Sequence, residues 1–194
     1  MVFRAAQEFF RTLFSGSQAE TQAPHDREAQ EVERRPAPER RWLSKAESDS
    51  ELVIVNGRPT FELIWRDELR FVSKSSGLQA APGNLALARA GVFYLRARGT
   101  RHYSAALQSA EIEIGSIIML KREPNNEHDP KAIALCGPVG TAAWGYVNRG
   151  FARRLSPRLD RGEPYTAVVT GVDGNVITVA IGESVLMEQL LPES

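Results

Sequence analysis

The chain has 194 residues, 42% of them hydrophobic, which suffices for one domain of ordinary size together with some non-globular sequence. Its single cysteine, Cys136, excludes an internal disulfide and any zinc site built from cysteines, and it suits a reducing cytoplasm. The formal net charge is zero, but residues 91–161 carry 11 basic and 6 acidic residues, whereas residues 162–194 carry 5 acidic and no basic ones. This basic block favours an anionic partner, with a well-solvated face as the simpler explanation.

Residues 1–14 repeat apolar side chains at the i, i+3, i+4, i+7 spacing and predict an amphipathic helix. Two explanations stay open for this helix. It docks onto a protein partner or, with less support, a membrane surface, or else it packs back onto the main domain. Residues 15–50 are rich in Gln, Glu, Arg, Pro and Ser and predict a disordered linker. No apolar run approaches the roughly 20 residues that a membrane-spanning helix needs, so we expect no membrane span and a cytoplasmic protein.

Residues 51–90 predict a β-hairpin and a connection, a candidate accessory subdomain. Two strand-like runs, 51–55 and 60–65, flank Asn56-Gly57, a dipeptide typical of tight hairpin turns. Residues 66–84 are polar, contain Ser-Ser-Gly and Pro-Gly breakers, and are expected to connect elements rather than form one.

The segment 91–182 predicts a small β-barrel. Asn148 is expected to N-cap a helix of residues 149–155 that continues as a turn to Asp160, and residues 106–110 predict a short turn or helix. Residues 183–194 form a C-terminal tail with one or two helical turns. The expected fold class is mainly β with short helices, as a small OB-like or SH3-like β-barrel. The predicted strands are 91–99, 111–123 with a bend at Gly115, 131–136, 141–147, and a hairpin of 165–172 and 175–181 around Asp173-Gly174.

No group of residues predicts catalysis. Cys136 ends an apolar strand and is interpreted as a core residue rather than a nucleophile. The acids around His128 lack the spacing of a metal site, and the chain has no GxxxxGK loop to hold phosphate. We therefore expect no enzyme activity, no cofactor and no metal.

Basic and aromatic residues instead indicate nucleic-acid binding. Arg101, His102 and Tyr103 combine a cation for phosphate with flat rings that stack on unpaired bases. The predicted helix adds a stripe of cations whose alternative explanation is a solvated helix face. Arginine without lysine favours phosphate, because a guanidinium offers two parallel donors. The stripe consists of Arg149, Arg153, Arg154, Arg158 and, beyond them, Arg161.

The runs LKREPNNEHDPKAIAL (120–135) and WGYVNRGFARRLSPRLDRG (144–162), with the earlier Arg101-His102-Tyr103, resemble the HIRAN domain over about residues 91–182. This family occurs attached to DNA-remodelling ATPases and as stand-alone bacterial proteins. The resemblance implies an OB-like barrel that binds single-stranded DNA, in the best-understood case at a free 3′ end, in DNA repair or replication-fork processing.

Position by position, the resemblance implies that His102 and Tyr103 hold the terminal base and that Arg101 contacts backbone or base. Asp129 would accept a hydrogen bond from the terminal 3′-hydroxyl, with His128 beside it. An ionised carboxylate only accepts hydrogen bonds, so it suits a hydroxyl and repels a continuing phosphate. The structural alternative is that Asp129 caps the turn. The candidate site is Arg101, His102, Tyr103, His128, Asp129, Tyr146, Arg149 and Arg153.

The sequence departs from the family pattern at His102 and His128, where the family often has other aromatic residues, and at Glu127, where proline is common. These departures motivate an alternative function: a protein-interaction adaptor on a HIRAN-like barrel that has lost DNA-end binding. A groove filled by residues 51–90, or site residues scattered over the surface, would favour this adaptor.

Overall fold

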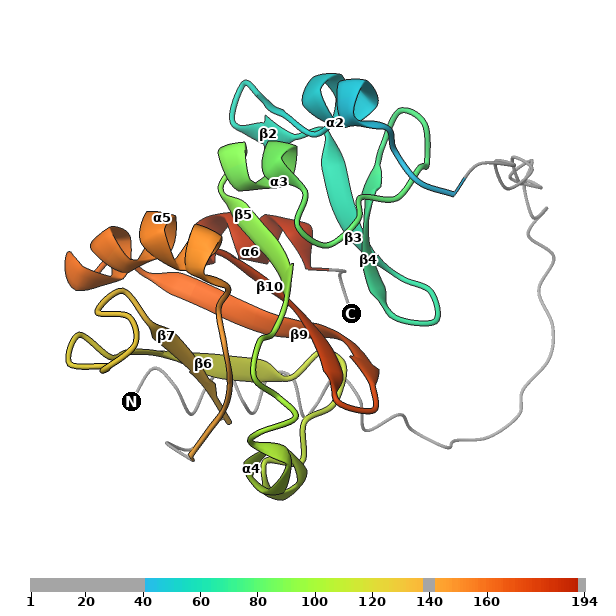
Figure 1. Cartoon of the computed structure of the whole chain (residues 1–194). Coiled ribbons are helices and arrows are strands. Elements are labelled where there is room, and N and C mark those ends of the chain that lie inside the picture. The colour runs from blue at the N-terminus through green and yellow to red at the C-terminus, as the bar shows by residue number, and fades with distance from the viewer. Residues whose placement is uncertain (1–40, 138–141, 192–194) are drawn as a thin grey trace, which may run out of the picture. The chain divides into compact units, whose positions relative to one another are not determined.

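Six antiparallel strands form the main sheet in the order β5-β10-β9-β6-β7-β8 (Figure 1). The computed structural model describes residues 41–137 and 142–191. The predicted helix of residues 1–14 and most of the predicted linker therefore lie outside the described residues. The six strands are β5 (Val92–Arg96), β6 (Ile117–Arg122), β7 (Ile133–Cys136), β8 (Ala143–Tyr146), β9 (Tyr165–Asp173) and β10 (Val176–Glu183).

The sheet closes into a small barrel through Arg98 and Tyr146. The chain continues past the end of β5, and the backbone amides and carbonyls of these two residues exchange hydrogen bonds of 2.8 Å in both directions. A closed sheet leaves neither β5 nor β8 as a bare edge at this point. The predicted mainly β fold, a small OB-like barrel with short helices, is confirmed.

Strands β5, β9 and β10 are buried on both faces. On β5, Phe93 and Leu95 point into the barrel core, while Val92 and Tyr94 point to a second core outside it, as the period of two along a strand requires. Inside the barrel, Trp144 is completely buried. Helix α5 (Arg149–Asp160) contributes Phe151 to the same core, with its ring edge-on to Phe93 at 5.6 Å between centroids.

The second core is built by residues 41–90 and by α6 (Ser184–Leu190). Figure 1 shows the N-terminal segment stacked on the side of the barrel that β5 and β10 form. Phe71 packs edge-on against Tyr94 of β5 at 5.1 Å between ring centroids, so the candidate accessory subdomain shares its core with the barrel. The elements of this segment are α2 (Lys45–Glu51), β1 (Ile54–Val55), β2 (Arg58–Pro59), β3 (Phe61–Trp65), β4 (Leu69–Ser73) and α3 (Leu85–Arg89).

Two expectations for residues 41–90 were wrong. The tight turn at Asn56-Gly57 exists, but it joins only the two-residue strands β1 and β2. Strand β3 pairs instead with β4, which lies in the expected connection, because Leu69, Phe71 and Val72 bury their apolar side chains. The predicted linker also ends too late, since Ser44 and Glu47 form a capping box that starts α2.

Three boundaries within the barrel also differ from expectation. Strand β6 begins at Ile117, because Gly115 has a φ of +92° and breaks the extended run. Helix α5 continues through Pro157, where a turn was expected, and Arg158 ties its last turn to the Tyr165 hydroxyl at 2.8 Å. In the final hairpin Asp173 pairs with Val176, so the two turn residues are 174 and 175.

The structure also contains the predicted cap of α5 and the predicted short helices within the described residues. Asn148 N-caps α5 by accepting a hydrogen bond from the Phe151 amide at 3.0 Å. The short helix α4 (Ser104–Ser109) lies where residues 106–110 predicted a turn or helix, and α6 occupies the C-terminal tail. No helix within the described ranges is long and apolar enough to cross a membrane.

Candidate functional site

Asn126 organises the turn between β6 and β7. Its side-chain oxygen accepts hydrogen bonds from the backbone amides of His128 at 3.0 Å and Asp129 at 3.2 Å. Its amide nitrogen donates to the Glu123 carboxylate at 2.9 Å. An asparagine that bonds its own following backbone is a common turn former, and it fixes the direction in which residues 128 and 129 leave the turn.

Arg122 fastens the far side of the same turn to helix α5. Its guanidinium donates to the carbonyls of Ala132 at 2.6 Å and Pro130 at 3.0 Å, and it pairs with Asp160 at 2.8 Å. Three engaged donors on one planar group restrain the loop at several points. The turn is therefore a rigid platform, held by Asn126 on one side and Arg122 on the other.

Asp129 is both a turn cap and a partner of helix α5. One carboxylate oxygen accepts the Lys131 amide at 2.9 Å, and the other accepts Arg149 Nε at 3.2 Å. The pKa of Asp129 lies below its usual value, mainly because of the Lys131 amide, and then because of the positive charges of Arg149 and Arg153. Asp129 is thus held as an anion with lone pairs left over, because a carboxylate offers about four acceptor positions.

Tyr146 and Tyr103 form an aromatic pair beside this turn. Their ring centroids lie 5.7 Å apart at an angle of 50°. The Tyr146 hydroxyl donates to Glu123 at 3.1 Å. Burial, followed by hydrogen bonding with Tyr103 and Glu123, raises the pKa of Tyr146 well above its usual value, so this hydroxyl stays protonated. Tyr103 keeps 38% of its surface exposed and presents ring area to solvent.

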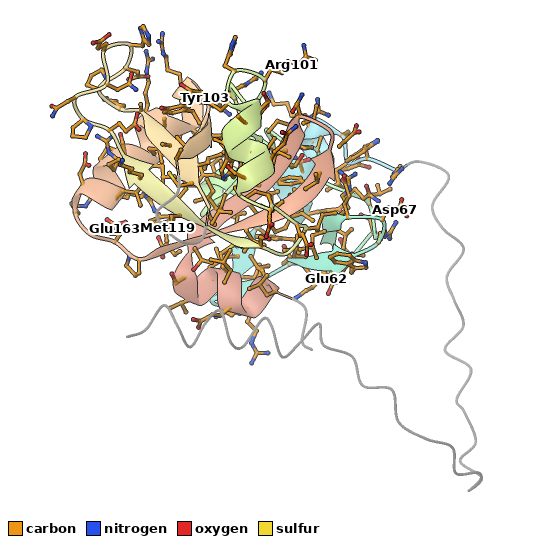
Figure 2. The ribbon with its side chains drawn as sticks, turned by 90° about the horizontal axis from the view of Figure 1, so that it is seen from below. Glu62, Asp67, Arg101, Tyr103, Met119 and Glu163 are labelled. Carbon is orange, nitrogen blue, oxygen red and sulfur yellow. The ribbon has the colours of Figure 1, made fainter. Side chains whose placement is uncertain are left out.

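Gly99 lies next to the Tyr103 ring and adopts a backbone conformation that favours glycine. It has a φ of +77°, and a Cβ built at this position would lie 3.4 Å from the ring edge. Figure 2 shows Tyr103 and Arg101 near each other at one end of the barrel beside α4, away from Glu62 and Asp67 of the N-terminal segment. Arg101 and His102 are both exposed in the tight turn that leads to Tyr103.

The predicted site residues fall into two groups. Tyr103, Tyr146, Asp129 and Arg149 belong to one connected set, which we call the end site, linked through Glu123 and Asn126. The other four lie exposed around it: Arg101, His102, His128 and Arg153. Of these, His128 touches the set through its carbonyl, which Arg149 Nη2 approaches at 3.5 Å.

The predicted stripe of arginines on α5 is only partly available. Arg158 is engaged by Tyr165 and Glu183, and Arg161 pairs with Glu163 at 2.6 Å. These two side chains fasten the end of the helix to β9, β10 and the following loop. Arg153 and Arg154 are exposed and form no ion pair with any described residue, whereas the exposed Arg149 pairs with Asp129.

Sequence reasoning missed the residues that hold the site in place. Glu123 is not among the predicted site residues, but it receives hydrogen bonds from both Tyr146 and Asn126. The described residues contain no group of three His, Cys, Asp or Glu side chains that suits a metal ion. Cys136 is buried, and burial raises the pKa of its thiol, which keeps the thiol neutral.

Comparison with known proteins identifies the family of the barrel. The family model described as the HIRAN domain matches residues 90–188, about half of the chain and slightly more than the predicted 91–182. No curated protein matches. A crystal structure of a Lactobacillus plantarum protein is 22% identical with a TM-score of 0.41, and it covers 45% of this chain and 87% of its own.

The crystal structure of the HIRAN domain of human HLTF is 20% identical with a TM-score of 0.41, and it covers 52% of this chain and 86% of its own. The NMR structure of the same human domain is 19% identical with a TM-score of 0.33, and the match covers 49% of this chain and 84% of that domain's chain. The match of the family model over half of the chain decides the assignment: the chain belongs to the HIRAN domain family.

Proposed function

We propose that this protein binds single-stranded DNA and recognises its free 3′ end at the end site. The observation that carries the proposal is the position of Asp129. Its carboxylate is held as an anion by the Lys131 amide and Arg149, and it shares a hydrogen-bonded network with the Tyr146–Tyr103 pair. The chain belongs to the HIRAN family, and the resemblance to this family implies DNA binding, which supports the same function.

Each group of the end site has a distinct task in this proposal. The exposed face of Tyr103 stacks on an unpaired base, which holds any base equally well. Arg149 and the exposed Arg153 attract phosphate. Asp129 supplies selectivity, because its free lone pairs accept a hydrogen bond from a 3′-hydroxyl, while its negative charge repels a phosphate at the same position.

The exposed residues around the end site complete the proposed contacts. Arg101 reaches the backbone or a base, His102 supports the base that Tyr103 stacks on, and His128 lies beside the terminal sugar. The proposed function is binding, and the hydrogen bonds of Glu123 and Asp129 maintain the shape of the site. We infer a role in handling DNA ends during repair or replication-fork processing, in the cytoplasm.

One observation favours the alternative of a protein-interaction adaptor. Ile54, Val55 and Trp65 of the N-terminal segment expose between 42% and 52% of their surface, and such side chains suit a protein partner. Residues 51–90 nevertheless pack on the outer face of the barrel and not over Tyr103 or Asp129. The end site therefore stays open, which is why DNA binding is the first proposal.

A titration with three single-stranded ligands tests the proposal. The ligands share one sequence and carry a 3′-hydroxyl, a 3′-phosphate or no end, as a circle. We expect the 3′-hydroxyl strand to bind about tenfold more tightly than the other two, with all affinities falling as salt rises. Equal binding of the three ligands refutes end recognition and leaves a general DNA-binding barrel. Binding of none of them, with capture of a protein partner that Trp65→Ala abolishes, would establish the adaptor.

A further inference from the structure

A pocket of about 580 Å³ lies between the beginning of α5 and the segment that precedes the barrel. Arg149, Phe151 and Arg154 of α5 line one side, and Arg98 lines it where the chain leaves β5. The opposite wall comes from Gly83 and Leu85, which lie outside residues 90–188 that match the HIRAN domain. The pocket is therefore formed jointly by the family's barrel and by the N-terminal segment of this chain.

The wall from the N-terminal segment is fixed to the barrel. The Gly83 amide donates to the carbonyl of Tyr94 on β5 at 2.6 Å. Asn84 caps α3 through its oxygen and donates to the Ser48 hydroxyl of α2 at 2.9 Å. These bonds hold Leu85, which is 51% exposed, in place as an apolar surface at the pocket. A rigid wall favours binding, since little conformational entropy is lost when a ligand arrives.

The pocket is lined by cationic side chains, one of which, Arg149, also pairs with Asp129. Its lining within the described chain holds three arginines and no acidic residue. Arg98 and Arg154 are exposed and form no ion pair with any described residue. Arg122, Arg158 and Arg161 of the barrel, by contrast, each pair with a carboxylate. Three guanidiniums around one cavity repel one another and together attract an anion.

The N-terminus of α5, which borders the pocket, carries a partial positive charge from the backbone. The first turn of α5 contains no acidic side chain, although acidic residues are favoured there. The Asn148 side chain accepts a hydrogen bond from the Phe151 amide. The amides of the first helical residues have no acceptor within the helix. The positive end of the helix dipole therefore adds to the arginine charges, rather than being neutralised by the sequence.

Arg149 connects this pocket to the end site. Its Nε donates to Asp129 at 3.2 Å, and the same side chain lines the pocket. A strand whose terminal nucleotide lies at Asp129 thus has its next backbone positions beside Arg149. The pocket offers cations for a phosphate on one wall and Leu85 for a sugar or base on the other.

We propose that the pocket of Arg98, Arg149 and Arg154 binds an internal phosphate of a single-stranded DNA whose 3′ end occupies the end site. The inference rests on the proposed function and extends it. It assigns a role to Arg98 and Arg154, and it makes the N-terminal segment part of the DNA-binding surface.

The test uses the full-length protein and a 3′-hydroxyl strand of about ten nucleotides, a length typical of one OB-like barrel. One linkage at a time is replaced by a neutral methylphosphonate. The variants are Arg98→Gln, Arg154→Gln and their combination. The matched control is Arg161→Gln at the other end of α5, which removes an equal charge outside the pocket. Thermal unfolding of each variant checks that the fold is intact.

We expect each pocket variant to weaken binding of the unmodified strand by about 3- to 10-fold. The slope of log affinity against log salt concentration should decrease by the amount expected for about one phosphate contact. One particular methylphosphonate should cause the same loss in the wild type and no further loss in the double variant. Leu85→Glu should weaken binding more than Leu85→Gln, because it places a negative charge at the pocket. Arg161→Gln should stay within about twofold of the wild type.

Two results overturn the inference. The first is a double variant that binds the unmodified strand as tightly as Arg161→Gln does. The second is a loss that is equal for every methylphosphonate position, since this would reflect general attraction rather than a phosphate site. Failure of the proposed function is separate: the wild type then shows no preference for a 3′-hydroxyl over a 3′-phosphate, whatever the pocket variants do.

Discussion

The Tyr146 hydroxyl donates a hydrogen bond to Glu123 at 3.1 Å, and this contact joins the strand that closes the barrel to the turn that carries Asp129. The same carboxylate oxygen of Glu123 accepts the side-chain amide of Asn126 at 2.9 Å. The aromatic pair and the acidic turn are therefore one unit, although they come from different parts of the sequence. In the proposed function, this fixed spacing positions Tyr103 for a base and Asp129 for the 3′-hydroxyl of the same nucleotide.

Replacing Tyr103 with alanine should weaken single-stranded DNA binding by about 1–3 kcal/mol, the usual value for loss of one stacked base. Tyr103 is 38% exposed, so the substitution should change the free energy of unfolding much less than the free energy of DNA binding. Tyr103→Phe is the matched control and should retain most of the affinity, since the ring remains. Fluorescence anisotropy with a labelled strand measures both. Equal affinity of Tyr103→Ala and the wild type would show that no base stacks on this ring.

Gly145→Ala should destabilise the protein by about 1–3 kcal/mol by crowding the barrel closure. A Cβ at this position would lie 3.3 Å from the Arg98 carbonyl oxygen and 3.3 Å from Thr100 Cγ2. Gly150→Ala is the control, because its Cβ meets only Asn148 Oδ1 at 3.4 Å and helices favour alanine by about 1 kcal/mol. Urea unfolding compares the two. If both substitutions shift stability in the same direction, crowding at the closure is not the cause.

Phe71→Ala should lower the free energy of unfolding by about 3–5 kcal/mol, because the ring is completely buried between the N-terminal segment and β5. Trp65→Ala, at 52% exposure, should have a far smaller effect. Probes in residues 41–90 and in the barrel should report one common unfolding transition, because the two regions share a core. Separate transitions for residues 41–90 and the barrel would contradict the shared core.

The preference for the 3′-hydroxyl strand over the circular strand should be constant from about pH 8 to pH 5, because Asp129 stays ionised above the ordinary aspartate pKa of about 3.9 and phosphodiesters do not titrate in this range. Its pKa is lower in the folded protein. The stability it contributes is therefore fully present above the unfolded pKa, and it is lost as the pH falls through the folded pKa. Competition binding across this range is the measurement. A preference over the circular strand that changes within this range would contradict selectivity by the Asp129 carboxylate.

The sequence predicted those elements that are marked by neighbouring residues, such as a helix cap or an alternating strand. Asn148 before an apolar and basic run identified α5, and the alternating strands around residues 173–175 identified β9 and β10. The pairing of β3 with β4 was missed, because the short strand Leu69–Ser73 lies among polar residues and is stabilised by burial against β5. Closure of the barrel between Arg98 and Tyr146 joins residues far apart in sequence and has no local signature.

The site divides in the same way. The turn around Asp129 and the aromatic Tyr103 were predicted, because turn formers and the family resemblance point to them directly. The part played by Glu123 depends on which side chains the fold places beside it, and that cannot be deduced from spacing. Arg158 was predicted to be available, but it is used within the fold because β10 places Glu183 next to it.

The most direct measurement is the ratio of affinities for a 3′-hydroxyl and a 3′-phosphate strand in Asp129→Asn. Asparagine keeps the shape and can still accept the Lys131 amide, but it removes the negative charge. Glu127→Gln removes a charge from the same turn and is the matched control. We predict that Asp129→Asn abolishes the preference of about tenfold, mainly by tighter binding of the 3′-phosphate strand, and that Glu127→Gln leaves it unchanged. An unchanged ratio in Asp129→Asn would contradict recognition of the 3′ end by this carboxylate.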